Sequence, residues 1–288
     1  MEDFPVEFYK DDVRSYPNSV SYTYISPKLR TILKELRSRY YIQALILYHK
    51  LALSIFIKSA IEELDDRKLP ESILRLYQSW FERVLNDFGQ QPDNYYNLKK
   101  DEIRKDIGVC SLRLIPIGGP WLVDTCSVGV RPLISSGPMK FFDYLAFVSF
   151  KAKGFKPFYR IHNYFRYLPR FNPEEMDRAY LRVAELLENN QGIKGLYRSS
   201  WFLDPEMDDI SPHLSYLRKV PEQNGAKVFR VGVRKSDIKS AIQLSLERRG
   251  LYEEGKYIPT IYAYIWPRKD LLKWAAGQLK KKKKNKES

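Results

Sequence analysis

A change in the spacing of apolar residues at Gly108 constrains the fold of this chain more than any other feature. Before it, residues 27–107 carry apolar side chains at three- and four-residue spacing, which predicts helices. After it, short apolar segments with the period of a strand alternate with helical segments, and Gly118-Gly119-Pro120 indicates a turn between the first two strands. This alternation predicts an α/β (or α+β) fold, a mixed β-sheet flanked by helices and preceded by an N-terminal helical region.

The same pattern predicts three parts of the chain. Residues 1–107 form an N-terminal, mostly helical region, residues 108–278 an α/β domain, and residues 279–288 a polybasic tail whose composition favours disorder. Residues 1–27 show no clear period and are expected to be irregular. The helical segment that begins near Pro27 is about forty residues long, so we expect a break within it.

The chain is basic in its body as well as in its tail. Its formal net charge is +14, of which the last ten residues, with six Lys and one Glu, contribute +5 and the rest +9. A positive surface attracts nucleic acid, anionic lipid or phosphorylated small molecules without distinguishing among them. Residues 280–288 are therefore a candidate contact for an anionic membrane or a nucleic acid. An aromatic content of 14% favours a folded body.

Cysteine content and the N-terminus predict the compartment. Cys110 and Cys126 are the two cysteines, which favours free thiols in a reducing environment. The acidic N-terminus lacks the basic start and apolar core of a secretion signal. The most apolar run, residues 42–57, is interrupted by polar side chains and falls short of the roughly 18 to 20 apolar residues that span a bilayer. These features predict a cytoplasmic protein, with peripheral association at the inner membrane face as the alternative.

Familiar signatures of catalysis are absent from the sequence. It contains no phosphate-binding loop of the G-x-x-x-x-G-K-[ST] type, no G-x-G-x-x-G, no G-x-S-x-G and no H-E-x-x-H. Its three His and two Cys are widely scattered, so no metal site is predicted.

Candidate sites are therefore sought at the carboxyl ends of strands, where open α/β sheets bind ligands. The first is Ser135, Ser136 and Gly137, which follow a strand and precede a helix that begins at Pro138. Backbone N–H groups at such a helix start can hold a phosphate. An ordinary Ser-capped helix with Pro in its first turn explains the same residues.

The second candidate is His162, near the end of an expected strand. An imidazole titrates near neutral pH and is the best general base that this sequence offers. A hydrogen-bonded structural histidine is the alternative.

The third candidate is the stretch after "IKGLY", where Arg198, Ser199 and Ser200 leave an expected strand. Trp201 offers an apolar wall, and Asp204 can cap the next helix or orient a base. Burying so many polar groups is costly unless they serve one another or a ligand. Strand-end capping, with Trp201 in the core, is the alternative.

The expected order of elements, a hairpin followed by alternating α and β units, resembles the acyl-CoA-dependent N-acyltransferases at the level of the fold. The pyrophosphate-binding arginine and glycine turn of that family are not recognisable in the sequence. The resemblance implies a soluble group-transfer enzyme that acts on a phosphate-bearing or acyl-carrier small-molecule substrate, with an acyl-CoA or acyl-carrier donor. His162 would remove a proton from an acceptor amine or hydroxyl, Ser199 or Ser200 would hydrogen-bond the reacting carbonyl, and Arg198 would bind an anion.

A basic protein that binds nucleic acid or an anionic membrane, without catalytic activity, is the alternative function. Its support is the net charge and the many aromatic side chains.

Overall fold

The computed structural model describes residues 5–16, 20–129, 138–243 and 245–287. The chain divides into two units. Unit 1 comprises Met1–Thr125 and His162–Phe171, and unit 2 comprises Cys126–Ile161 and Asn172–Ser288. The sequence-based domain boundaries at residues 108 and 279 stay predictions.

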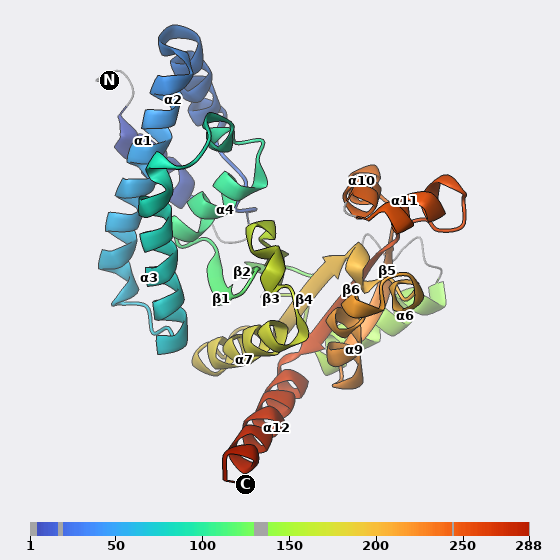
Figure 1. The fold of residues 1–288 in the computed structure, drawn as a ribbon. Coiled ribbons are helices and arrows are strands. Elements are labelled where there is room, and N and C mark those ends of the chain that lie inside the picture. Colours follow the sequence, from blue (N-terminus) through green and yellow to red (C-terminus); the bar gives the residue numbers. More distant parts are fainter. Residues whose placement is uncertain (1–4, 17–19, 130–137, 244, 288) are drawn as a thin grey trace. The chain divides into compact units, whose positions relative to one another are not determined.

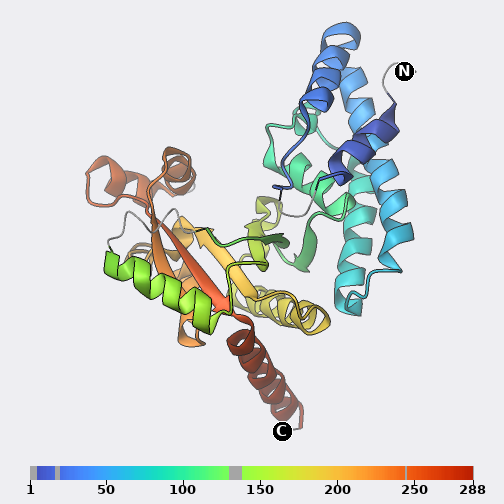
Figure 2. The ribbon, with the colours of Figure 1, turned by 180° about the vertical axis from the view of Figure 1, so that it is seen from behind.

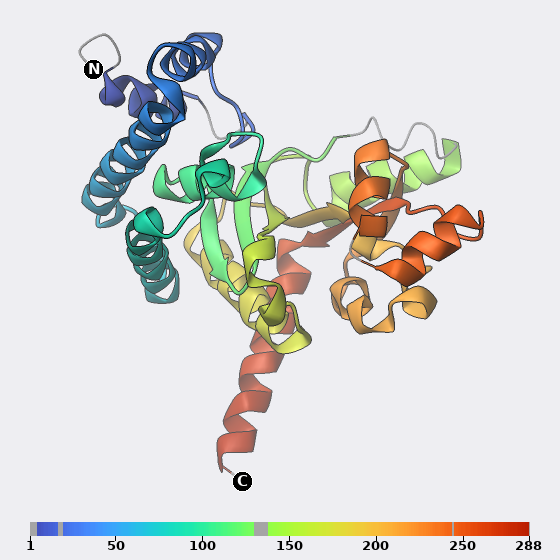
Figure 3. The same cartoon turned by 45° about the horizontal axis from the view of Figure 1, so that its top comes forward.

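Unit 1 is mostly helical and contains a β-hairpin. Its longer helices are α1 (Val6–Arg14), α2 (Pro27–Leu64), α3 (Glu71–Asn86) and α4 (Asp101–Cys110), with short helical turns η1 (Asp87–Gly89), η2 (Asp93–Tyr96) and η4 (Phe165–Arg170). Strands β1 (Ile115–Gly118) and β2 (Trp121–Cys126) pair antiparallel across the expected glycine turn, with Ile115 opposite Val123 (Figure 3).

Helix α2 begins at the expected residue and contains a break, whose position was not predicted. The Ser26 hydroxyl accepts the N–H of Leu29 at 2.9 Å, and Pro27 occupies the first turn. At Tyr41 the backbone has φ 63° and ψ 180°, which interrupts the helix. By length and composition α2 could cross a membrane, the one helix in the described part of the chain that meets this test, and half of its apolar window is buried in the structure.

Helix α1 lies in a region that was expected to be irregular. Its nine residues bury Val6, Tyr9 and Val13 at the three- and four-residue spacing of a helix, a short pattern that the sequence analysis missed. The Asp12 carboxylate accepts the N–H of Ser26 at 3.2 Å, and Arg14 donates to Ser59 at 2.7 Å. These contacts with α2 stabilise a helix that is too short to form alone in water.

A buried carboxylate, Asp106 of α4, ties the helices of unit 1 together. It is fully buried and accepts the indole N–H of Trp80 at 2.9 Å, the guanidinium of Arg83 and the hydroxyl of Tyr95. The hydroxyl of Tyr164 lies 3.4 Å away. These donors come from α3, η2 and the segment that follows β3, so one anion connects three parts of the unit.

Unit 2 carries the parallel strand pair that the alternating pattern predicts. Its strands are β3 (Phe158–Asn163, whose last two residues belong to unit 1), β4 (Gly195–Ser200), β5 (Lys227–Gly232) and β6 (Ile261–Pro267). They follow the order β3-β4-β6-β5, parallel between β3 and β4 and antiparallel in the other pairs. The predicted fold class, a mixed sheet with flanking helices behind a helical N-terminal region, is confirmed.

Helices cover both faces of these strands (Figures 1 and 2). The helices of unit 2 are α6 (Pro138–Ala146) with the π-helical turn η3 (Phe147–Lys151), α7 (Pro173–Asn189), α8 (Met207–Ile210), α9 (Tyr216–Gln223), α10 (Lys235–Gln243), α11 (Leu246–Glu253) and α12 (Arg268–Glu287), with short turns η5 (Trp201–Leu203) and η6 (Pro212–Leu214). On one face, Tyr144 of α6 packs edge-on against Phe229 at 4.8 Å between ring centroids. On the other, Tyr180 of α7 packs against Trp266 at 5.2 Å.

We expect Asp106→Ala to reduce the free energy of unfolding by about 3 kcal/mol, because it leaves the Arg83 guanidinium, 14% exposed, without this carboxylate. Urea unfolding of the full chain, followed by circular dichroism, measures the change. Asp66→Ala, an exposed position, is the matched control and should stay within about 0.5 kcal/mol. A loss below about 1 kcal/mol for Asp106→Ala would contradict the role given to this carboxylate.

Candidate functional site

The polar residues at the end of β4 divide between its two faces. Tyr197 packs against the apolar cluster beneath α6, whereas Arg198 contacts Met176 of α7 on the opposite face. Because side chains alternate along a strand, Ser199 lies on the Tyr197 face and Ser200 on the Arg198 face. The sequence analysis grouped Arg198, Ser199 and Ser200 in one candidate site, but their side chains therefore face different parts of the protein.

Arg198 is buried inside unit 2. Its side chain is 1% exposed, and one guanidinium nitrogen lies 3.6 Å from the sulfur of Met176. It also forms side-chain hydrogen bonds with Tyr180 and Tyr264, whose hydroxyls are 3.2 Å apart. Burial raises the pKa of both tyrosines, and the nearby guanidinium partly offsets this. The guanidinium thus links α7 to β6 beneath β4.

The residues that follow Ser199 hold the turn after β4. The Ser200 hydroxyl accepts the N–H of Phe202 at 3.3 Å and caps η5. Trp201 is 3% exposed, and the guanidinium of Arg248 lies over its ring at 4.8 Å. These contacts match the capping and core roles that the sequence analysis set beside substrate binding.

Asp204 anchors the same turn to the start of β6. Its carboxylate accepts the N–H of Thr260 at 3.1 Å and the N–H of Glu206 at 3.3 Å, and the Tyr257 hydroxyl lies 3.5 Å away. Burial raises the pKa of Asp204, and the two backbone N–H groups partly offset this. The carboxylate is 2% exposed, so its partners are within the protein.

Ser199 and Tyr197 form a half-buried hydroxyl pair on the α6 face. Burial raises the pKa of Tyr197, and the nearby Ser199 side chain partly offsets this. Arg160 of β3, which pairs with Tyr197 in the ladder, and Arg234 both lower this pKa and partly offset the effect of burial. Sequence reasoning missed Tyr197 and Arg160, although strand alternation applied to "GLYRSS" would have placed Tyr197 beside Ser199.

His162 lies in unit 1, at the end of β3, beside an acidic residue. Its Nε2 is 3.0 Å from Oδ1 of Asp124, and its side chain is 17% exposed. The ring of Tyr22 packs edge-on against the imidazole, with 4.9 Å between the ring centroids. A carboxylate at this distance can orient an imidazole, as a general base requires. The carboxylate that accompanies His162 is Asp124, and Asp204 has the separate structural contacts given above.

The predicted phosphate site at Ser135, Ser136 and Gly137 lies outside the described residues.

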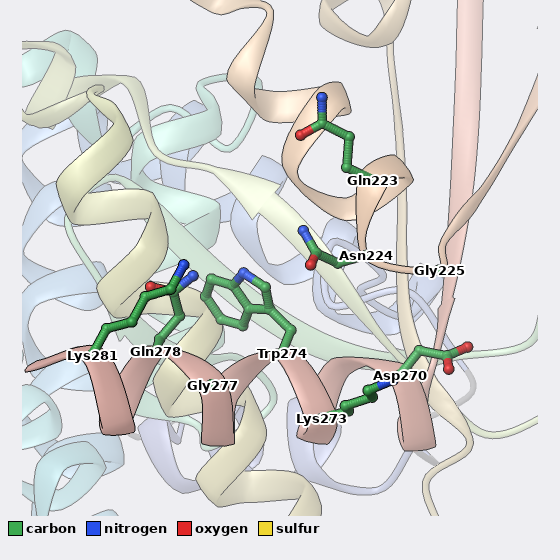
Figure 4. A pocket seen from close by; sticks show the side chains of 9 residues that line it. All are labelled: Gln223, Asn224, Gly225, Asp270, Lys273, Trp274, Gly277, Gln278 and Lys281. Carbon is green, nitrogen blue, oxygen red and sulfur yellow. The ribbon is translucent and has the colours of Figure 1, made fainter.

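A hollow of about 380 Å³ opens elsewhere in unit 2, between the turn after α9 and the exposed side of α12 (Figure 4). Gln223, Asn224 and Gly225 line one wall, and side chains of α12 line the other. Its Asp270 carboxylate already pairs with Lys151 at 3.2 Å. The sequence-predicted site residues do not line this hollow. Within the described residues, no group of three or more His, Cys, Asp and Glu side chains could hold a metal ion.

Comparisons with models of protein families, with curated proteins and with solved structures find no match for this chain. The functional argument therefore depends on the residues themselves.

The contacts distinguish residues that hold the fold from residues that can serve a ligand. We expect Asp204→Ala to reduce the free energy of unfolding by about 2 kcal/mol, because it leaves buried N–H groups without an acceptor. Ser199→Ala, at a half-buried position, should change it by no more than about 0.5 kcal/mol. Urea unfolding of both variants measures the difference. Equal losses in the two variants would make Ser199 a structural residue as well.

Proposed function

We propose that this protein is a group-transfer enzyme that moves an acyl group from a carrier thioester to an amine or hydroxyl acceptor. The observation that carries the proposal is the incomplete ladder between the parallel strands β3 and β4. The described pairs join Tyr159 to Leu196 and Arg160 to Tyr197, whereas the ladder between β4 and β6 continues to Ser200. The described β3–β4 pairs thus end at Tyr197, and the proposal places the ligand beside β4 beyond that residue.

This position agrees with a general rule of open sheets, in which ligands bind outside the carboxyl ends of parallel strands. A pantetheine-type carrier arm contains amide groups, and amides can pair with an open strand edge as an added strand does. An acyl thioester on such an arm is therefore a donor whose chemistry fits the edge of β4.

Side chains near this edge supply the other requirements of acyl transfer. The hydroxyls of Ser199 and Tyr197 are donors for the oxygen of a reacting carbonyl. Arg160 and Arg234 offer positive charge for an anionic carrier or acceptor.

In the proposed step the acceptor nitrogen or oxygen attacks the thioester carbonyl, a bond to carbon forms and the carbon–sulfur bond breaks. The acceptor proton passes to a base or to water, and the carrier leaves as a thiol after it takes up a proton.

We expect the full chain to release thiol from at least one of acetyl-, octanoyl- and palmitoyl-CoA in the presence of a panel of amino acids and amines. Ser199→Ala should lower kcat/KM about tenfold or more through loss of one carbonyl donor.

Ser149→Ala, an exposed serine on η3, is the matched control and should retain full activity. Melting temperatures of the variants check that each is folded. Thiol release no faster than the uncatalysed rate with every donor, or equal activity of Ser149→Ala and Ser199→Ala, would overturn the proposal.

A further inference from the structure

The positive charge of the chain resides almost entirely in unit 2. This unit contains 29 Lys and Arg against 17 Asp and Glu, a net charge of +12. Unit 1 contains 20 against 18, a net charge of +2. Such asymmetry between two parts of one chain indicates that the basic part meets an anionic partner.

The helix formed by α6 and η3 exposes large apolar side chains on the same unit. Met139 is 85% exposed, Phe142 66% and Phe150 84%. With the exposed Ala146, their spacings are those of one helix face, which we call the α6 stripe. The opposite side of the helix already packs into unit 2 through the residues Tyr144, Val148 and Ala152. The α6 stripe is therefore a second apolar face, beyond what the core of the unit needs.

Lysines border the α6 stripe. Lys140, Lys153 and Lys156 are exposed on or just after this helix, and the exposed Lys151 pairs with Asp270 at 3.2 Å. The acidic residue beside the stripe, Asp143, pairs with Lys227 of β5, which reduces its effect on the surface charge. The border is thus positive around an apolar centre.

We propose that the α6 stripe docks this protein onto the surface of an anionic lipid bilayer. Phe and Met side chains enter the boundary between headgroups and acyl chains, while lysines beside them contact anionic headgroups. A bilayer suits a convex helix face, since it needs no matching groove. The basic residues that border the stripe are all lysines, which act as point charges, whereas nucleic-acid recognition favours the planar, bidentate guanidinium of Arg.

Helix α12 adds charge to the same unit. Lys280–Lys284 are exposed near its end, where the helix extends away from the strands (Figures 1 and 2). Five successive residues distribute around a helix, so these lysines form a positive end rather than one face. Each lysine near an anionic membrane strengthens attachment about fivefold, and salt weakens this contribution.

The test is co-sedimentation of the full chain with phosphatidylcholine vesicles, with and without phosphatidylglycerol. We expect binding to the anionic vesicles alone, weakened by salt. The double variant Phe142→Ser/Phe150→Ser should bind at least about tenfold more weakly, because it removes the apolar side chains that insert. Replacing Lys280–Lys284 by Gln should weaken binding and flatten its salt dependence.

Leu246→Ser on α11 is the matched control, because Leu246 is 82% exposed in the same unit but outside the α6 stripe. It should bind vesicles as the unmodified chain does. All substituted positions are exposed, so unchanged melting temperatures are expected. Equal vesicle binding by the double variant and the unmodified chain would overturn the proposal. Tighter binding to a single-stranded RNA, lost with the same two phenylalanines, would overturn it in favour of a nucleic acid.

This proposal does not rest on the acyl-transfer proposal, because vesicle binding is measured without a substrate. Loss of activity in the Ser199→Ala variant leaves the sedimentation result unaffected, so the failure of either proposal can be recognised separately.

Discussion

The start of strand β4 is the constraint on which the geometry of unit 2 depends. Gly195 has φ +151°, and a Cβ atom there would lie 2.2 Å from the carbonyl oxygen of Trp266, so a side chain is excluded. The neighbouring Lys194 donates its N–H to Pro157 at 2.8 Å, and its carbonyl accepts the N–H of Arg268 at 2.9 Å. One short segment thus joins β3, β4 and β6. Because the strands are fixed there, their opposite ends are where backbone groups can serve a ligand.

The two faces of β4 then have different chemistry. Arg198 extends toward α7, where Tyr180 and Tyr264 surround its guanidinium, and this contact supports the position of the strand. Tyr197 and Ser199 extend toward α6, half-buried beside an apolar cluster. A strand that holds a substrate must also keep its position in the sheet. Strand β4 has a stable polar contact on one face and accessible hydroxyls on the other.

Local patterns in the sequence predict most of the elements but fewer of the site residues. The helix at 173–189, capped by Asn172, and the break in α2 follow from capping and period, which are local properties. The pairing of Arg160 with Tyr197 depends on the register of two strands separated by a helix, and the approach of Asp124 to His162 likewise depends on tertiary structure. Neither leaves a signal in the sequence. The position of Ser199 and Arg198 on opposite faces of β4 was predictable, because side chains alternate along a strand.

Hydrogen–deuterium exchange of the full chain with increasing concentrations of acyl-CoA tests the central claim most directly. An acyl thioester held along β4 should slow the exchange of backbone amides in residues 158–161 and 197–200, with no change in α3. Protection confined to the hollow beside α12, or unchanged exchange in residues 197–200 while the thioester binds, would contradict a site at the open end of the β3–β4 pair.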